Sequence, residues 1–139
     1  MPERPLDHAG MEILGPAECL RLLWSHQVGR IAFVERGEPQ VLPVHYRLHD
    51  NKIVFRSAVG AKLDAAIFQA PVAFEVDGAD EEHGKGWSVL VHGTARQVED
   101  ETEIGALEAL GLEAWVQGGQ PLRWIEIQPN EISGRRIPS

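Results

Sequence analysis

The chain has 139 residues, of which 43% are hydrophobic, and it carries a formal net charge of −8. This size suffices for one core and leaves little room for a second, so we expect a single domain over residues 13–139 behind a flexible N-terminal segment, 1–12. The acidic balance argues against nucleic acid or an anionic membrane as a partner, because both are bound through clustered Lys and Arg. It does not exclude a small anion site built from a few cations.

The chain has one cysteine, Cys19, which cannot form an internal disulfide. This excludes the disulfide framework of small secreted proteins and favours a reducing, cytoplasmic setting. The first residues are polar and contain no apolar signal region, and no apolar run reaches the ~18 residues of a membrane span. We therefore expect a cytoplasmic protein that does not enter a membrane.

The first expected element is a helix over residues 16–26. Pro16 suits its first turn, Glu18 is favourable at the positive end of the helix dipole, and Gly29 lies beyond its end. Runs of β-forming residues follow, separated by turns so short that the strands can pair only in the antiparallel sense. The expected strands span 30–35, 40–48 and 52–56, with turns at 36–39 and 49–51.

A long strand is predicted over residues 86–98, with a bend at Gly93. The preceding segment, 77–85, is charged and contains glycine, so we expect a mobile loop there. An irregular basic tail is expected at 134–136. The remaining predicted elements are helices over 61–69 and 101–110, strands over 72–76 and 122–127, and a turn at 118–121.

Six strands with short connections and few helices predict a mainly β (α+β) fold, a small closed or nearly closed antiparallel barrel with helices over its ends. The interior of such a barrel is filled by its own side chains. A sizeable ligand is therefore expected outside the barrel, in a groove, most simply one between two subunits.

Several kinds of chemistry are excluded by their missing patterns. The glycine motifs of Rossmann and Walker nucleotide sites are absent, and Ser88 lacks the second glycine of a nucleophile elbow. His45 and His49 are four residues apart, but along a strand that spacing separates them by roughly 13 Å, too far to share an ion. We therefore predict no metal site.

One segment carries the residue types of a phosphate site. Arg56 and Ser57 end a predicted strand, Gly60 lies in a short loop, and Lys62 falls in the first turn of the next helix. The N-terminus of a helix offers unpaired N–H groups, and the hydroxyl, guanidinium and ammonium add further donors that phosphate accepts. The alternative is that Arg56 and Lys62 are solvated charges and Ser57 caps the helix.

Four stretches then occur in a specific order and spacing: VGRIA at 28–32, VLPVHY at 41–46, IVFRSAVGAKL at 53–63 and GWSVLVHG at 86–93. On these stretches the chain resembles the FMN-binding split-barrel superfamily of pyridoxamine 5′-phosphate oxidase-like proteins, and within it a branch of small actinobacterial-type flavoproteins. The resemblance implies a six-stranded antiparallel split β-barrel with flanking helices, a homodimer, and FMN as the cofactor.

The resemblance also implies roles for residues on the strand over 40–48. The backbone at Pro43 and Val44 would meet the polar edge of the flavin ring, with Val44 as the nearer N–H donor because proline has none. Tyr46 would lie beside the same ring. The alternative for Pro43 is a proline at a strand edge or bulge.

The same family pattern places Arg56, Ser57 and Lys62 at the FMN phosphate. Trp87 and Ser88 match positions from which the long strand approaches a flavin, often the flavin of the partner subunit. An indole can cover a ring face and a hydroxyl can reach its polar edge. The alternative for Trp87 is a core or interface aromatic.

The function that follows from this resemblance is an FMN-dependent oxidoreductase that transfers a hydride or electrons to or from a small organic substrate at a homodimer interface. No residue is identified as a general acid or base; Tyr46 and His45 are nearest by position. The substrate-phosphate positions of the true oxidases are not matched, and Arg135 is more simply explained as part of a basic surface tail. The alternatives are an F420-dependent reductase of the same fold, or a non-enzymatic flavin- or haem-binding protein for storage or sensing.

Overall fold

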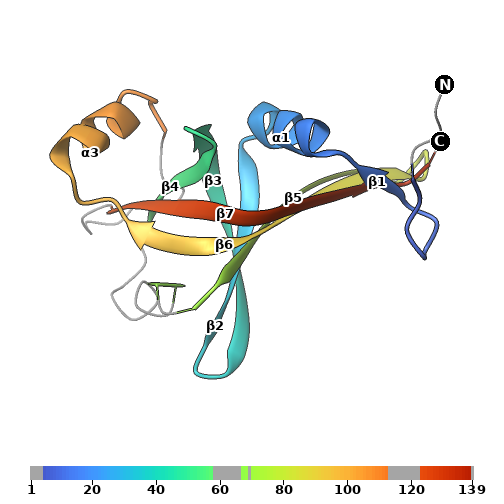
Figure 1. Cartoon of the computed structure of the whole chain (residues 1–139), viewed down its shortest axis with the longest axis horizontal. Helices are drawn as coiled ribbons and strands as arrows, with labels where there is room; N and C mark the ends of the chain where they lie inside the picture. Colours follow the sequence, from blue (N-terminus) through green and yellow to red (C-terminus); the bar gives the residue numbers. More distant parts are fainter. Residues whose placement is uncertain (1–4, 58–66, 69, 113–122, 139) are drawn as a thin grey trace.

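The computed structural model describes residues 5–57, 67–68, 70–112 and 123–138. In these ranges seven strands form one antiparallel sheet that curls round on itself, with two helices packed against it (Figure 1). The elements in chain order are β1 (Glu12–Leu14), α1 (Pro16–Ser25), β2 (Val28–Glu35), β3 (Glu38–His49), β4 (Lys52–Ser57), β5 (Val72–Asp80), β6 (Lys85–Gln97), α3 (Glu101–Glu108) and β7 (Arg123–Arg136).

Six of the strands close into a ring. Their order is β7-β4-β3-β2-β5-β6, and β6 pairs back onto β7. The short strand β1 adds to the outer edge of β7. The predicted mainly β fold, a six-stranded antiparallel split barrel with flanking helices, is therefore confirmed, and β1 is an element that the sequence reading did not predict.

The predicted antiparallel meander of β2, β3 and β4 is confirmed. The backbone conformation of its two turns explains how such short connections join the strands. Arg36 and Gly37 connect β2 to β3, and Asp50 and Asn51 connect β3 to β4; all four have positive φ angles, between 51° and 76°. Two successive left-handed residues match the right-handed twist of the flanking strands. The strands consequently pair from their last residues, with Glu35 opposite Glu38.

Two predicted irregular segments are strand instead. β5 continues to Asp80 and β6 begins at Lys85. The prediction of a mobile loop over 77–85 was therefore wrong for residues 77–80 and 85, and only a four-residue turn separates the strands. The basic tail at 134–136 was also wrong, because these residues pair with β6 on one edge and with β1 on the other. Both segments have polar sequences, and long-range pairing overrides their weak local preference for strand.

The bend predicted at Gly93 is confirmed as a shift in the β6–β7 register between His92 and Gly93. A side chain at Gly93 would place its Cβ 2.3 Å from the carbonyl oxygen of Gln128, so only glycine fits there. The helices at 16–25 and 101–108 are also confirmed. The predicted turn at 118–121 and most of the predicted helix over 61–69 lie outside the described residues.

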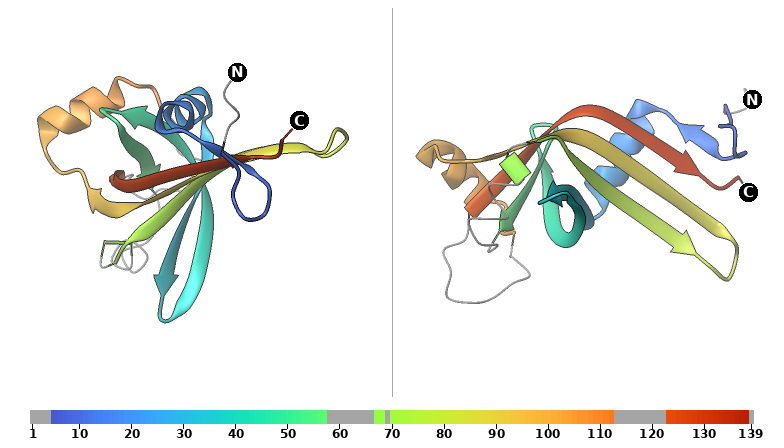
Figure 2. Two further views of the ribbon diagram at one scale, coloured as in Figure 1. Left: turned by 45° about the vertical axis from the view of Figure 1, so that its right-hand side comes forward. Right: turned by 90° about the horizontal axis from the view of Figure 1, so that it is seen from below.

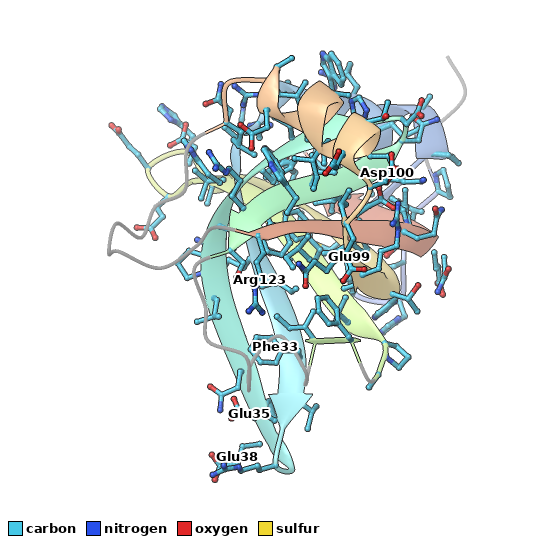
Figure 3. The ribbon with its side chains drawn as sticks, turned by 90° about the vertical axis from the view of Figure 1, so that its left-hand side faces the viewer. Phe33, Glu35, Glu38, Glu99, Asp100 and Arg123 are labelled. Atoms are coloured by element: carbon cyan, nitrogen blue, oxygen red, sulfur yellow. The ribbon has the colours of Figure 1, made fainter. Side chains whose placement is uncertain are left out.

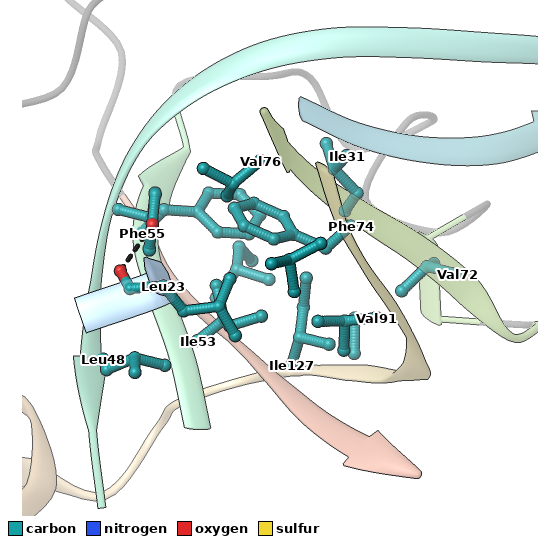
Figure 4. Close-up of a cluster of buried hydrophobic side chains, with 14 of the residues drawn as sticks. Leu23, Ile31, Leu48, Ile53, Phe55, Val72, Phe74, Val76, Val91 and Ile127 are labelled. Atoms are coloured by element: carbon teal, nitrogen blue, oxygen red, sulfur yellow. Dashed lines mark hydrogen bonds between the residues drawn. The ribbon is translucent and has the colours of Figure 1, made fainter. Parts of the chain in front are cut away.

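Buried apolar side chains form two clusters on the two faces of the sheet. The larger cluster fills the barrel beneath α1 and includes Phe55 and Phe74 (Figure 4). The smaller cluster lies on the outer face, where α3 covers Val54 and Trp124. Alternate residues of β4 and β7 therefore point either into the barrel or toward α3.

The β5–β6 hairpin and the end of β7 extend away from α3, so the sheet has two distant ends (Figure 2). No helix in the described ranges is long and apolar enough to cross a membrane.

Candidate functional site

Strand β3 has one edge that is only partly paired. On the β2 side it pairs from Glu38 to His45, whereas on the β4 side it pairs only from Tyr46 to His49. Over residues 38–45 the β4-side edge thus has no strand partner in the part of the chain that the structure describes. This open edge is the split in the barrel, and it contains Pro43 and Val44.

The alternating directions of the N–H and C=O groups along β3 determine which of them point to the open edge. The N–H of Tyr46 is donated to the carbonyl of Gln27, on the β2 side, at 2.9 Å. Because the backbone groups of successive residues point to alternate edges, those of Val44 also point to β2, whereas those of Val41 and Pro43 point to the open edge. The expectation that Val44 supplies the N–H donor to a ligand is therefore wrong, and the Pro43 carbonyl is an acceptor directed at this edge.

The side chain of Tyr46 lies in the core. It is 0% exposed, its hydroxyl donates to the carbonyl of Leu23 at 2.6 Å, and its ring packs edge-on against Phe74. Burial raises the pKa of the Tyr46 hydroxyl well above its usual range. Tyr46 is therefore part of the barrel interior, and its side chain is not accessible to a ligand.

Arg56 and Ser57 leave the end of β4 on opposite faces of the sheet. Ser57 follows Phe55 by two residues and shares the face that points into the barrel, where it is 4% exposed. Arg56 shares the face of Val54, and its guanidinium carbon lies 5.3 Å from the centroid of the Trp124 ring. The two side chains therefore leave β4 in opposite directions, whereas the sequence predicts that both contact one phosphate.

Arg123, which the sequence did not identify as a site residue, lies beside Ser57. Arg123, the first residue of β7, is directly opposite Ser57 in the β4–β7 pairing, and the register places both side chains on the same face. Arg123 and Phe33 face the viewer together at this end of the barrel (Figure 3). No local sequence signal links Ser57 to Arg123, because the strand pairing alone brings them together. Lys62 lies outside the described residues.

Trp87 and Ser88 lie at the other end of the sheet. Trp87 is opposite Arg136 on β7, whereas Arg56 is opposite Trp124. From Trp124 to Arg136 is twelve steps along an extended strand, a path of roughly 40 Å. Trp87 and the end of β4 therefore pair with positions twelve residues apart on β7.

The local surroundings of Trp87 explain its position. Its ring is 4.7 Å from that of His26, and its indole N–H edge passes so close to Gly78 that a Cβ there would lie 2.6 Å from Nε1. Ser88 points to the opposite face of β6, since successive strand residues alternate. The two residues thus contribute to different faces of this end of the sheet.

A charged cluster adjoins Pro43 on the outer face of the barrel. Arg30, the β2 partner of Pro43, lies 3.4 Å from Glu75 and 3.3 Å from Asp77. Burial, followed by a hydrogen bond with Asp77, raises the pKa of Glu75 to about 7. Glu75 is therefore a carboxyl group able to exchange a proton near neutrality, which the sequence reading did not identify.

Among the described residues, no three His, Cys, Asp or Glu side chains are grouped so that they could hold an ion. The sole cysteine, Cys19, is buried, and burial raises the pKa of its thiol.

The closed ring of six strands and the open edge of β3 define a split-barrel protein. Residues 15–136 match the family model described as pyridoxamine 5′-phosphate oxidase. The chain belongs to the pyridoxamine 5′-phosphate oxidase family.

Three relatives illustrate this membership. The chain is 31% identical to the uncharacterized protein Rv0080 of Mycobacterium tuberculosis over 86% of this chain and 81% of that protein. A structure of a FAD-binding protein from Mycobacterium smegmatis is 35% identical, with a TM-score of 0.73 over 90% of this chain and 97% of that one. A Corynebacterium glutamicum protein assigned to the pyridoxamine 5′-phosphate oxidases is 31% identical, with a TM-score of 0.80 over 99% of this chain and 96% of that one.

Proposed function

We propose that this protein binds a flavin nucleotide and uses it to transfer a hydride or electrons between a reduced donor and a small organic substrate. The bound flavin would supply the redox chemistry. The FMN portion, common to FMN and FAD, is the part that the site would hold. The FAD-binding relative from M. smegmatis supports a flavin as the ligand.

The observation that carries the proposal is the proximity of two binding features at the split. The open edge of β3 directs the Pro43 carbonyl outward as a hydrogen-bond acceptor, which complements the N–H on the polar edge of a flavin ring. The end of β4 places the Ser57 hydroxyl opposite the Arg123 guanidinium, and both groups can donate to a phosphate. Lys62, predicted for the same phosphate, follows β4 in the chain.

We further propose that the site is shared by two subunits of a homodimer. Trp87 and Ser88, the other residues predicted to contact the flavin, pair with the opposite end of β7 from the residues that pair with the end of β4. A second copy that presents its Trp87 end to the open edge of the first would complete two equivalent sites.

A titratable carboxyl group, that of Glu75, lies on β5, two strands away from β3. Its carboxyl group is linked through Arg30 to the strand that carries Pro43, and its pKa is raised to about 7. A group with this pKa can both donate and accept a proton near neutral pH. Arg30 would orient the carboxyl group, because its guanidinium also contacts Asp77.

Flavin titration of the purified protein tests the proposal. We expect FMN and FAD to bind, with a shift of the flavin visible spectrum, and NADH or NADPH added without oxygen to bleach it if the protein turns over. Arg123→Ala should weaken FMN binding by the ~1.5–3 kcal/mol of a charge-assisted hydrogen bond. The matched control is Arg21→Ala, which removes an exposed guanidinium from α1. Equal effects of the two variants, or no binding of either flavin, would refute the proposed site.

A further inference from the structure

Two hydrogen-bond donors on the outer face of the barrel have no acceptor. The Nε atom of Arg56 and the Nε1 atom of Trp124 are both buried, and neither has a hydrogen-bond partner. The two residues are direct partners in the β4–β7 pairing, and the guanidinium lies over the indole ring. Two neighbouring donors are therefore enclosed without an acceptor in the part of the chain that the structure describes.

This arrangement is costly for the free protein. A buried N–H without an acceptor loses its hydration and regains nothing, and Trp124 is only 4% exposed. The nearest carboxylate on the same face of β7, Glu126, already accepts from Arg96 at 2.9 Å and lies 3.5 Å from Lys52. Glu126 is therefore already engaged by two other cations, and neither donor bonds to it.

The chemistry of the pair favours an anionic oxygen. A guanidinium offers a planar fork of donors suited to phosphate, and stacking on an aromatic ring holds that fork in a fixed plane. The indole N–H adds a neutral donor with a fixed direction. Together they present positive charge and two kinds of N–H to one ligand group.

The position of the pair relates it to the flavin site. Arg56 precedes Ser57 by one residue, and neighbouring Cα atoms are about 3.8 Å apart, but the two side chains lie on opposite faces of β4. A ligand with one phosphate at Ser57 and Arg123 would need a second phosphate, carried past the end of the strand, to reach Arg56. FMN has one phosphate, whereas FAD has two adjacent ones.

We propose that Arg56 and Trp124 form a second anion subsite, which binds the adenosine-side phosphate of FAD and makes the protein prefer FAD over FMN. The inference rests on the proposed flavin function. It assigns Arg56 a role different from the FMN-phosphate contact expected from the sequence, and it gives Trp124 a ligand-binding role in addition to its packing beneath α3.

The test compares the affinities of FMN and FAD in five proteins: the wild type, Arg56→Ala, Trp124→Phe, and the controls Arg21→Ala and Trp24→Phe. Trp124→Phe keeps an aromatic ring in the cluster and removes only the N–H and part of the ring system. Trp24 is 72% exposed on α1, so Trp24→Phe controls for the loss of an indole. Thermal unfolding of each variant checks that it is folded. If Trp124→Phe is not folded, the comparison relies on Arg56→Ala alone.

The wild type should bind FAD more tightly than FMN. Arg56→Ala and Trp124→Phe should each weaken FAD binding by about tenfold or more, as expected for loss of a hydrogen bond to a charged group, and leave FMN affinity unchanged. Equal losses of FMN and FAD affinity would overturn the proposal. They would indicate that Arg56 contacts the phosphate that FMN and FAD share. Unchanged FAD affinity in both variants would show that the two N–H groups do not donate to FAD, and would overturn the proposal. FMN binding without any preference for FAD would overturn this inference alone, whereas binding of neither flavin would overturn the proposed function as well.

Discussion

Ser57 lies directly opposite Arg123 at the end of the β4–β7 pairing, although the two residues come from opposite halves of the chain. The pair stands next to the point where β3 and β4 separate, since β3 pairs with β4 only from Tyr46 onward. A hydroxyl and a guanidinium therefore share one face beside an open strand edge. In a protein with a net charge of −8, anion binding depends on such local placement of a few cations.

Tyr46→Phe should separate core stability from ligand binding. The substitution removes the hydroxyl that donates to the Leu23 carbonyl at 2.6 Å and leaves that buried acceptor unsatisfied. The free energy of unfolding should fall by about 1–3 kcal/mol, measured by urea denaturation, while flavin affinity stays unchanged. A loss of flavin affinity in a variant of unchanged stability would instead place the hydroxyl at the ligand.

Cys19 should be unreactive in the folded protein. The thiol is 1% exposed beneath α1, and burial together with the Glu18 charge raises its pKa. Because the thiolate is the reactive form, a thiol reagent such as DTNB should label the native protein far more slowly than the denatured protein, which should take up one equivalent. Rapid labelling of the native protein would show that α1 opens readily or that the thiol is accessible.

Glu75 should make stability depend on pH. Its pKa is about 7 in the folded protein against an ordinary 4.5, so the folded state favours the protonated carboxyl. This contribution is complete below about pH 4.5 and is lost as the pH rises through 7. The free energy of unfolding of the wild type relative to Glu75→Gln should therefore decrease between pH 5 and pH 8, by about 1 kcal/mol or less because the side chain is a third exposed.

Urea denaturation of the wild type and Glu75→Gln at several pH values measures this difference. Lys52→Gln is a suitable control, because Lys52 contacts Glu126 on another part of the surface. A difference between wild type and Glu75→Gln that is constant across the range would mean that Glu75 titrates normally and is not a proton donor near neutrality.

Much of the fold was predictable because its local signals are strong. The proline at the start of α1 and the short polar turns of the β2–β3–β4 meander determine those elements within a few residues. The failures occurred where pairing with distant strands decides the structure. Residues 77–80 and 134–136 are polar and contain glycine, so they resemble loops, yet each is hydrogen-bonded along its length to another strand.

The candidate site was less predictable than the fold because it depends on which way each residue faces. Val44 follows Pro43 and was expected to donate beside it, but alternation along β3 turns its backbone to β2. Arg56 and Ser57 are adjacent in sequence and diverge for the same reason. Arg123 could not be identified at all, because only the closure of β7 against β4 brings it to Ser57.

The central claim is that one flavin site is assembled from two subunits, the Arg123 end of one and the Trp87 end of the other. Mixing two defective variants, Arg123→Ala and Trp87→Ala, tests it most directly. Each variant alone should bind little FMN, but subunits exchanged in equal amounts should form mixed dimers in which one of the two sites is intact. The mixture should then recover about a quarter of the wild-type FMN-binding capacity. A mixture that binds no more FMN than the two variants measured separately would contradict a shared site.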